Sequence, residues 1–225
     1  MAVSDPCLET LRVLGHEMRR PLTVIRGAST LLIDDSDALP PASRLQMLEM
    51  IDRSATAMSD LIDDLLTAVH LELGDVRYLS EPVDVAALVA DAVEAARYED
   101  PERGVDVSGV DGGQVEADRE HAVRALRALV VNAIRYSPGA GDVEVISSSE
   151  ADAVNLRVLD RGPGIPAPER ERAFEKFSRL DPNTGGAGLG LFLARGLARG
   201  MGGEITLSER EDGGTDVCFT LRRSG

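Results

Sequence analysis

The chain has 225 residues, of which 43% are hydrophobic and 28% are charged, and this composition predicts a soluble globular protein of one large domain or two small ones. Its formal net charge of −15 argues against a nucleic-acid partner, because affinity for phosphate backbones comes from clustered Lys and Arg. No apolar run approaches the roughly 20 residues that span a bilayer, so we expect no membrane segment in this chain and a cytoplasmic location. Cys7 and Cys218 lack metal-ligand spacing and are expected to be free thiols.

The first third of the chain has the apolar periodicity of two long helices. Apolar residues recur at three- and four-residue steps from Leu8 to Leu32, and a second such run extends from Leu45 to Leu73 after a break at 34–43. These runs predict an antiparallel helical hairpin. Two helices alone bury little apolar surface, so we expect residues 1–75 to form a four-helix bundle with a second copy of the chain.

From residue 76 the pattern changes to short strands that alternate with helices. Helices are expected near 84–97, 118–136 and 190–199, and strands near 105–110, 142–147, 154–160, 204–208 and 215–221. Residues 76–225 are therefore predicted to form an α+β sandwich in which helices cover one face of a mixed sheet. The predicted fold class is multidomain, with an all-α hairpin ahead of this sandwich.

The stretch GHEMRRPL, residues 15–22, places a histidine in the first predicted helix. At about 100° per residue, His16 lies roughly 200° from the apolar Leu14 and Met18 and therefore faces solvent. Pro21 has no N–H for the carbonyl of Glu17, so we expect the helix to bend or loosen after His16. Taken alone, this stretch favours an exposed histidine beside a tolerated proline.

The predicted helix that ends in LVVNAIRYSP carries Asn132 and Arg135 on the face opposite its apolar residues. An amide oxygen is a suitable ligand for a Mg²⁺ that carries nucleotide phosphates, and Arg135 can pair with the phosphate oxygens. A plain polar residue near a helix end explains Asn132 equally well.

Two glycine-containing stretches follow. DRGPGIP begins with Asp160 at the end of a predicted strand, where its carboxylate can accept a hydrogen bond from the amine of adenine while Gly162 and Gly164 let the backbone approach a flat ring. A simple turn is the alternative. The glycine-rich segment 185–190 precedes a predicted helix whose free N–H groups can receive phosphates. The order of these motifs along residues 132–190 indicates a nucleotide site more strongly than any one of them.

This arrangement resembles the catalytic core of sensor histidine kinases of two-component systems, whose ATP-binding domain belongs to the ATPase group that includes gyrase, Hsp90 chaperones and MutL. GHEMRRPL resembles the family's phosphoacceptor box, usually SHELRTPL. Residues 132–138 resemble its asparagine box, 160–164 its first glycine box, FEKF at 174–177 its phenylalanine box, and GAGLGL at 186–191 its second glycine box. DGGTDVCFTL resembles the closing strand, where Thr215 would lie beside adenine.

The resemblance implies a protein histidine kinase, homodimeric through residues 1–75, that binds ATP and Mg²⁺ and phosphorylates His16. Glu17 would orient the imidazole, Asn132 would ligate Mg²⁺, and an aspartate in the receiver domain of a response regulator would be the next acceptor. Segment 161–185 would form a lid over the nucleotide. The residues expected to bind the nucleotide are Asn132, Arg135, Tyr136, Asp160, Gly162, Gly164, Ile165, Phe174, Lys176, Phe177, Gly186, Gly188, Leu189, Gly190 and Thr215.

Two positions depart from the family pattern. Ala128 stands one turn before Asn132, where the family usually has another asparagine, and this predicts weaker positioning of magnesium or phosphate. Arg20 stands four residues after His16, where the family usually has threonine or asparagine, and this bears on dephosphorylation. The family normally has a sensor domain ahead of the hairpin, so we expect either the cytoplasmic part of a larger membrane-bound sensor or a soluble kinase that receives its input from a partner.

Two rival functions share these features. A dimeric docking scaffold with an inactive nucleotide site is favoured by Ala128. A serine-directed kinase of the anti-sigma type has the same ATP-binding fold, but it does not need a helical hairpin that carries an outward histidine.

Overall fold

The computed structural model describes residues 6–34, 39–97, 103–137, 143–181 and 185–225, with side chains from Arg12 onward. The chain divides into two compact units. The first comprises Met1–Leu66 with Gly185–Ala187, and the second comprises Thr67–Thr184 with Gly188–Gly225. Among the described residues, no helix has both the length and the apolar character needed to cross a membrane.

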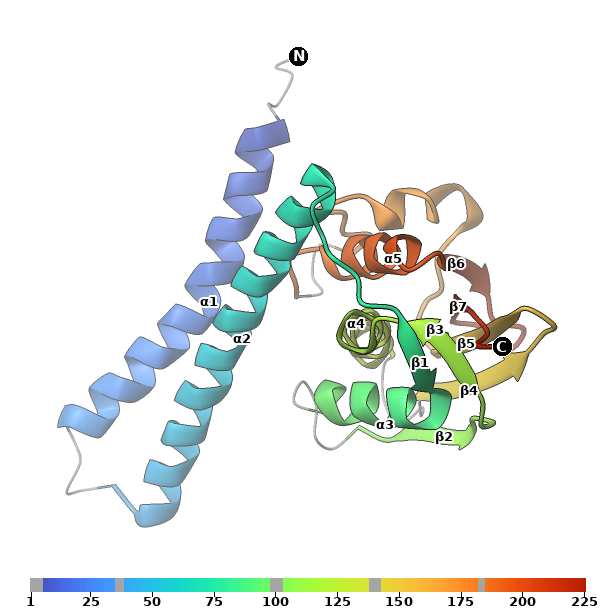
Figure 1. The fold of residues 1–225 in the computed structure, drawn as a ribbon. Helices are drawn as coiled ribbons and strands as arrows, with labels where there is room; N and C mark the ends of the chain where they lie inside the picture. The colour runs from blue at the N-terminus through green and yellow to red at the C-terminus, as the bar shows by residue number, and fades with distance from the viewer. Residues whose placement is uncertain (1–5, 35–38, 98–102, 138–142, 182–184) are drawn as a thin grey trace. The chain divides into compact units, whose positions relative to one another are not determined.

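The first unit is built from two long helices, α1 (Pro6–Asp34) and most of α2 (Pro41–Leu73), which run antiparallel (Figure 1). The predicted hairpin is therefore confirmed. Helix α1 continues through Pro21 without interruption, so the expected loosening after His16 does not end the helix. Two residues after the proline, the Thr23 hydroxyl donates to the carbonyl oxygen of Arg19 at 2.8 Å.

The second unit contains a mixed five-stranded sheet with the strand order β2-β4-β5-β7-β6. The pair β2–β4 is parallel and the other three pairs are antiparallel. Helices α3, α4 and α5 lie along one face of this sheet (Figure 1), which confirms the predicted α+β layer. The strands are β2 (Val105–Gly109), β4 (Val143–Ser149), β5 (Ala153–Leu159), β6 (Glu204–Glu209) and β7 (Thr215–Arg222), and the helices are α3 (Val85–Ala96), α4 (Arg119–Tyr136) and α5 (Gly190–Gly200).

A second, two-stranded antiparallel sheet pairs β1 (Glu81–Asp84) with β3 (Gln114–Ala117), and the sequence analysis did not predict either strand. Four residues are too few to show an alternating pattern, and β1 includes Pro82, which cannot donate to a strand ladder. Two short 3₁₀ helices, η1 (Ala167–Glu169) and η2 (Arg172–Phe174), were also not predicted.

The core of the second unit lies between the helices and the sheet. Helix α4 buries Leu126, Leu129 and Val130 completely, and the alternation along β7 buries Phe219 and Leu221. Because the apolar face of α4 is buried in this core, the opposite, polar face of the helix points away from the core. Cys218 lies on the opposite face of β7 and is a free thiol. Burial raises the pKa of this thiol.

The last turns of α2 belong to the second unit. Ala68 is buried, and Leu71 contacts α5 so closely that a Cβ at Gly196 would lie 2.7 Å from the Leu71 Cδ1. One turn further along α5, a Cβ at Gly200 would lie 2.0 Å from the Tyr78 hydroxyl oxygen. Because the two glycines have no side chains, Leu71 and Tyr78 can pack directly against the backbone of α5, and neither glycine position has room for a larger residue.

Candidate functional site

His16 lies on α1 with 80% of its side chain exposed, as the helical periodicity predicts. The neighbouring Glu17 side chain is only 12% exposed, and its Oε1 lies 4.0 Å from Nδ1 of His16. That distance is too long for a hydrogen bond, so the ring and the carboxylate are neighbours that are not bonded to each other. The imidazole is therefore accessible, with a carboxylate beside one of its two nitrogens.

Asp160 follows β5 directly and is almost completely buried, with 5% of the residue exposed. Its Oδ1 accepts hydrogen bonds from the backbone N–H groups of Gly162, at 2.8 Å, and Thr215, at 2.9 Å. The Asp160 N–H in turn donates to the carbonyl oxygen of Thr215 at 2.9 Å. Because both bonds from these N–H groups go to Oδ1, they fix the orientation of the carboxylate and leave Oδ2 as an acceptor for a ligand.

Close backbone approaches surround Asp160. A Cβ at Gly162 would lie 2.7 Å from the carbonyl oxygen of Tyr136, so this position admits only glycine beside the end of α4. Gly164 has a φ of +74° and packs against the Gly214 carbonyl in the β6–β7 turn. The predicted Ile165 is half-buried against the core, and its carbonyl accepts from the Arg170 guanidinium at 3.1 Å.

The C-terminal half of α4 carries the next group of predicted residues. Asn132 is half-buried, and Arg135 is exposed in the last turn. Burial raises the pKa of the Tyr136 phenol, while the positive charges of Arg135 and Arg179 oppose that rise and thus lie near the ring. Pro138, the last residue of the predicted asparagine box, falls outside the described residues. The helix end therefore presents an amide, a phenol and nearby guanidinium groups.

The beginning of α5 faces this part of α4. A Cβ at Gly190 would lie 4.0 Å from the Cβ of Ala128, so the first turn of α5 packs one turn before Asn132. Leu189 is buried and its carbonyl accepts from the Leu193 N–H, which starts the helix. Gly188 has a φ of +70°, while Gly186, with a φ of +115°, lies in the short segment that groups with the first unit.

The predicted residues of the phenylalanine box lie in different surroundings. Phe174 is buried in the core with 8% of its surface exposed. Lys176 forms an ion pair with Glu72 and lies 5.8 Å from the centre of the Phe192 ring. Phe177 has a φ of +61°, rare for a non-glycine residue, and its N–H donates to the Gly188 carbonyl at 2.9 Å. Of the predicted lid, residues 182–184 are outside the described part of the chain.

The structure also identifies residues near the site that the sequence analysis missed. The positive charge of Arg179 acts to lower the pKa of the Tyr136 phenol. The only sequence signal for Arg179 is its position directly after FEKFS. Arg210, in the β6–β7 turn, donates to the backbone carbonyl of Asp160 at 3.4 Å and to Oε1 of Glu144 at 2.6 Å. No sequence pattern links Arg210 to Asp160, because 50 residues separate them.

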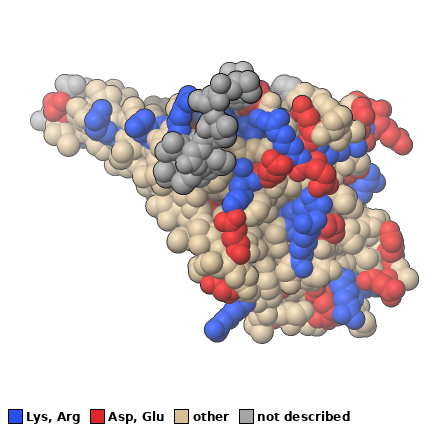
Figure 2. Space-filling model, turned by 90° about the horizontal axis from the view of Figure 1, so that it is seen from above, with Lys and Arg blue, Asp and Glu red and all other residues tan. Residues whose placement is uncertain are grey.

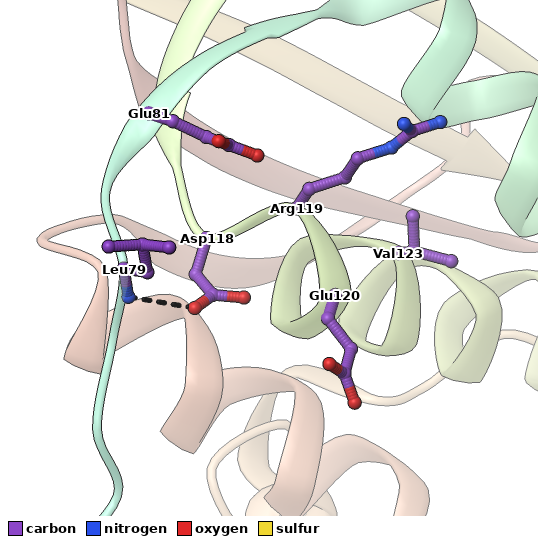
Figure 3. A pocket seen from close by; sticks show the side chains of 6 residues that line it. All are labelled: Leu79, Glu81, Asp118, Arg119, Glu120 and Val123. Atoms are coloured by element: carbon purple, nitrogen blue, oxygen red, sulfur yellow. Dashed lines mark hydrogen bonds between the residues drawn. The ribbon is translucent and has the colours of Figure 1, made fainter.

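A cavity of about 400 Å³ lies elsewhere in the second unit, at the N-terminal end of α4 (Figure 3). Leu79, Glu81, Asp118, Arg119, Glu120 and Val123 line it. Figure 3 shows the Leu79 N–H directed at Asp118 Oδ2, a hydrogen bond of 2.8 Å. At 1.5 Å of rise per residue, Asn132 lies about 20 Å further along α4 than Asp118. This cavity is therefore separate from the candidate nucleotide site.

Charged side chains of both signs are interspersed on the face seen in Figure 2. Ion pairs also form within the second unit, such as Arg157 with Asp216 and Arg119 with Asp91. The net charge of −15 therefore gives this chain no general positive field that would attract an anion.

Comparisons with known proteins agree with this arrangement. A family model described as the His Kinase A (phospho-acceptor) domain matches residues 8–74, and one described as Histidine kinase-, DNA gyrase B-, and HSP90-like ATPase matches residues 117–225. The Signal transduction histidine-protein kinase/phosphatase MprB of Mycobacterium bovis is 35% identical over 209 residues, which are 89% of this chain and 40% of MprB. The chain therefore spans about two fifths of the length of this curated relative.

Two solved structures match nearly the whole chain. The Acinetobacter baumannii histidine kinase AdeS has a TM-score of 0.64 at 26% identity and covers 93% of this chain and 97% of its own. Full-length ShkA, solved in complex with AMPPNP, has a TM-score of 0.67 at 25% identity and covers 96% of this chain and 46% of its own.

Fold and site together define a class of protein in which a helical phosphoacceptor hairpin precedes an ATP-binding domain of the gyrase and Hsp90 type. The chain belongs to the sensor histidine kinases of two-component signal transduction and contains their catalytic core. The resemblance of the ordered motifs to those of sensor histidine kinases is thereby confirmed.

Proposed function

We propose that this chain uses MgATP to phosphorylate His16 and that the phosphoryl group then passes to an aspartate of a response regulator. The observation that carries the proposal is that one chain contains both an 80% exposed histidine on the hairpin and a buried, oriented Asp160 in the ATP-binding domain. Because ATP and receiver domains are cytoplasmic, the proposed reaction takes place in the cytoplasm.

Adenine recognition would centre on Asp160. Its Oδ2 can accept from the exocyclic amine of adenine, whereas the corresponding position of guanine is a carbonyl oxygen, which an acceptor repels. Thr215, held against Oδ1, would complete the adenine pocket, and Gly162 and Gly164 leave room for the ring. This geometry supports binding of ATP rather than GTP.

The phosphates would lie between the C-terminal half of α4 and the start of α5. Arg135 would pair with phosphate oxygens, and the N–H groups at the beginning of α5 would face them. Asn132 fits a Mg²⁺ ligand because its amide is half-buried and no described residue hydrogen-bonds it. Ala128 supplies no oxygen one turn away, so the ion would keep more of its water ligands. Mg²⁺ neutralises charge on the β- and γ-phosphates when bound.

Phosphoryl transfer would use the His16 imidazole as nucleophile. With Nδ1–H turned toward Glu17 Oε1, the lone pair of Nε2 points outward and attacks the γ-phosphorus. A nitrogen–phosphorus bond forms, the bond from the γ-phosphorus to the bridging oxygen breaks, and ADP leaves with the electron pair. Glu17 takes up the Nδ1 proton of the resulting cation. An aspartate carboxylate of the regulator would later attack the same phosphorus. As the nitrogen–phosphorus bond breaks, Glu17 returns the proton to Nδ1, so that His16 leaves as neutral imidazole.

We infer that the kinase is a homodimer through residues 1–75. In the described part of the first unit, Ala28 is the buried hydrophobic residue, while large apolar side chains stay exposed. These are Leu22, Leu31, Ile33, Leu45, Leu48, Met50, Ile62 and Leu66. At roughly 25 cal/mol per Å², covering such side chains in a four-helix bundle gives a substantial driving force for dimerisation. A monomer by analytical ultracentrifugation at micromolar concentration contradicts this proposal.

The experiment that tests the proposed function is labelling with [γ-³²P]ATP and Mg²⁺, followed by acid or alkali. Phosphohistidine is lost in acid and kept in alkali, so wild type should carry an acid-labile label and His16→Gln should carry none. An acid-stable label indicates a serine-directed kinase instead. A chain that takes no label acts as a docking scaffold.

A further inference from the structure

Arg195 in the second turn of α5 has a confined guanidinium, with 15% of its side chain exposed. It contacts two other parts of the second unit. Its Nη1 donates to Oε2 of Glu171 at 2.8 Å, and its Nε donates to Oε1 of Glu204 at 2.9 Å. Its Cζ also lies 4.2 Å from the centre of the Phe174 ring, a cation–π contact.

The contacts with Glu171 and Phe174 hold one short turn. Glu171 precedes η2, and Phe174 is the last residue of η2 and the first of the phenylalanine box. The Phe174 N–H donates to the Glu171 carbonyl, so the two residues that Arg195 contacts are linked through the backbone as well. One guanidinium thereby fastens this turn to α5.

Glu204 fixes the direction of that guanidinium from the other side. Burial acts to raise the pKa of the Glu204 carboxyl, but hydrogen bonds from the Ile205 N–H and from Arg195 and Arg199 outweigh it and lower the pKa. Glu204 is the first residue of β6, and the second arginine, Arg199, uses Oε2 at 2.9 Å. A planar guanidinium held by two carboxylates and a ring has little freedom to turn.

The phenylalanine box is therefore attached at two points, once to α5 and once to the segment that leads into it. Arg195 holds it at Phe174, and the hydrogen bond from the Phe177 N–H to the Gly188 carbonyl holds it three residues later. Gly188 lies two residues before the first residue of α5, where the phosphates are proposed to bind. By contrast, the described hydrogen bonds that orient Asp160 come from Gly162 and Thr215 and not from α5.

We propose that Arg195 is a positioning residue for phosphoryl transfer, which sets the phenylalanine box and the start of α5 relative to each other and thereby aligns the triphosphate. This inference rests on the proposed kinase function. If it is correct, replacing Arg195 should slow phosphoryl transfer to His16 but should leave adenine binding at Asp160 unchanged.

The test compares Arg195→Met, Arg195→Lys and Arg199→Met in the full chain. Arg199 is the matched control, because it pairs with the same Glu204 from the same helix but contacts neither Glu171 nor Phe174 in the described interactions. We expect the kcat for His16 phosphorylation to fall about tenfold in Arg195→Met, a factor in the range of a desolvated cation–π contact. KM for ATP and Kd for ADP should change less than about twofold, since the adenine contacts are intact.

Arg195→Lys should restore only part of the rate, because an ammonium keeps the charge but not the planar stack and the two-sided hydrogen bonding. Arg199→Met should match wild type. Hydrogen exchange of residues 171–177 should be faster in Arg195→Met and unchanged in Arg199→Met, and this readout does not depend on His16 labelling.

The inference is overturned by unaltered exchange and kcat in Arg195→Met, or by equal losses in Arg195→Met and Arg199→Met. Loss of ADP affinity in proportion to kcat also contradicts it, since that pattern reflects general damage to the domain. A wild-type chain that gives no labelled His16 refutes the proposed function instead, and the exchange comparison then decides whether Arg195 anchors the phenylalanine box.

Discussion

Replacing Asp160 with asparagine isolates the proposed contact with adenine. The side chain keeps its size, and the amide oxygen can still accept from the Gly162 and Thr215 N–H groups, which hold Oδ1 at 2.8 and 2.9 Å. The NH₂ group then occupies the position of Oδ2 and presents a donor to the adenine amine, which is also a donor. The expected result is weaker ATP binding in a domain that remains folded.

The size of this effect follows from the lost interaction. A hydrogen bond to a charged acceptor contributes about 1.5–3 kcal/mol, and Asp160 is 5% exposed, so little solvent screening reduces that value. The Kd for ATP should therefore rise about 10- to 150-fold, since each 1.4 kcal/mol is a factor of ten. Selectivity for ATP over GTP should fall as well, because the new NH₂ group can donate to the carbonyl oxygen of guanine.

Isothermal titration calorimetry with ATP, ADP and GTP measures these changes, and Asp216→Asn is the matched control. Asp216 is equally buried in the same sheet but pairs with Arg157 and Ser208. Its variant should lose stability without losing nucleotide affinity. If Asp160→Asn binds ATP within twofold of wild type while its circular dichroism is unchanged, the adenine assignment is wrong.

Three further predictions concern other parts of the chain. Asn132→Ala, or chelation of Mg²⁺ with EDTA, should suppress His16 phosphorylation more than ADP binding, because the metal acts on the transferring phosphoryl group, and unchanged labelling in EDTA removes Asn132 from the metal role. Arg20→Thr should raise the rate at which a phosphorylated receiver domain is dephosphorylated, because the exposed Arg20 guanidinium has five donors and no acceptor with which to orient the attacking water; brisk phosphatase activity in the wild type contradicts this idea. Asp118→Asn should flatten the acid side of the stability profile. Burial acts to raise the pKa of the Asp118 carboxyl, but hydrogen bonds from the Leu79 and His121 N–H groups lower it below the unfolded value of about 3.9. The wild-type melting temperature should therefore fall more steeply than that of the variant as the pH drops from about 5 to about 3, and parallel curves contradict this.

The elements around the candidate site could be predicted because each has its own local signal. The apolar face of α4 predicted that Asn132 and Arg135 point away from the core, and Asp160 was predicted at a strand end from the run before it. The exposure of His16 followed from helical geometry alone. In each of these cases the periodicity of neighbouring residues fixes the direction of the side chain.

Contacts between distant segments could not be predicted in the same way. The hydrogen bond from the Thr215 N–H to Asp160 crosses 55 residues, and it depends on the pairing of β5 with β7. The sequence around Arg195 gives no signal for its role, because its contacts with Glu171, Phe174 and Glu204 exist only in the folded domain. Strands β1 and β3 were missed because four-residue strands are specified by their partner rather than by their own pattern.

The most direct test of the central claim is to locate the phosphate. Wild type and His16→Gln are incubated with MgATP, quenched in alkali, and analysed by tandem mass spectrometry under non-acidic conditions. We expect one modified residue, His16, in the wild type and an unmodified chain in the variant. A phosphate on any other residue, or equal phosphorylation of the two proteins, contradicts the assignment of His16 as the acceptor.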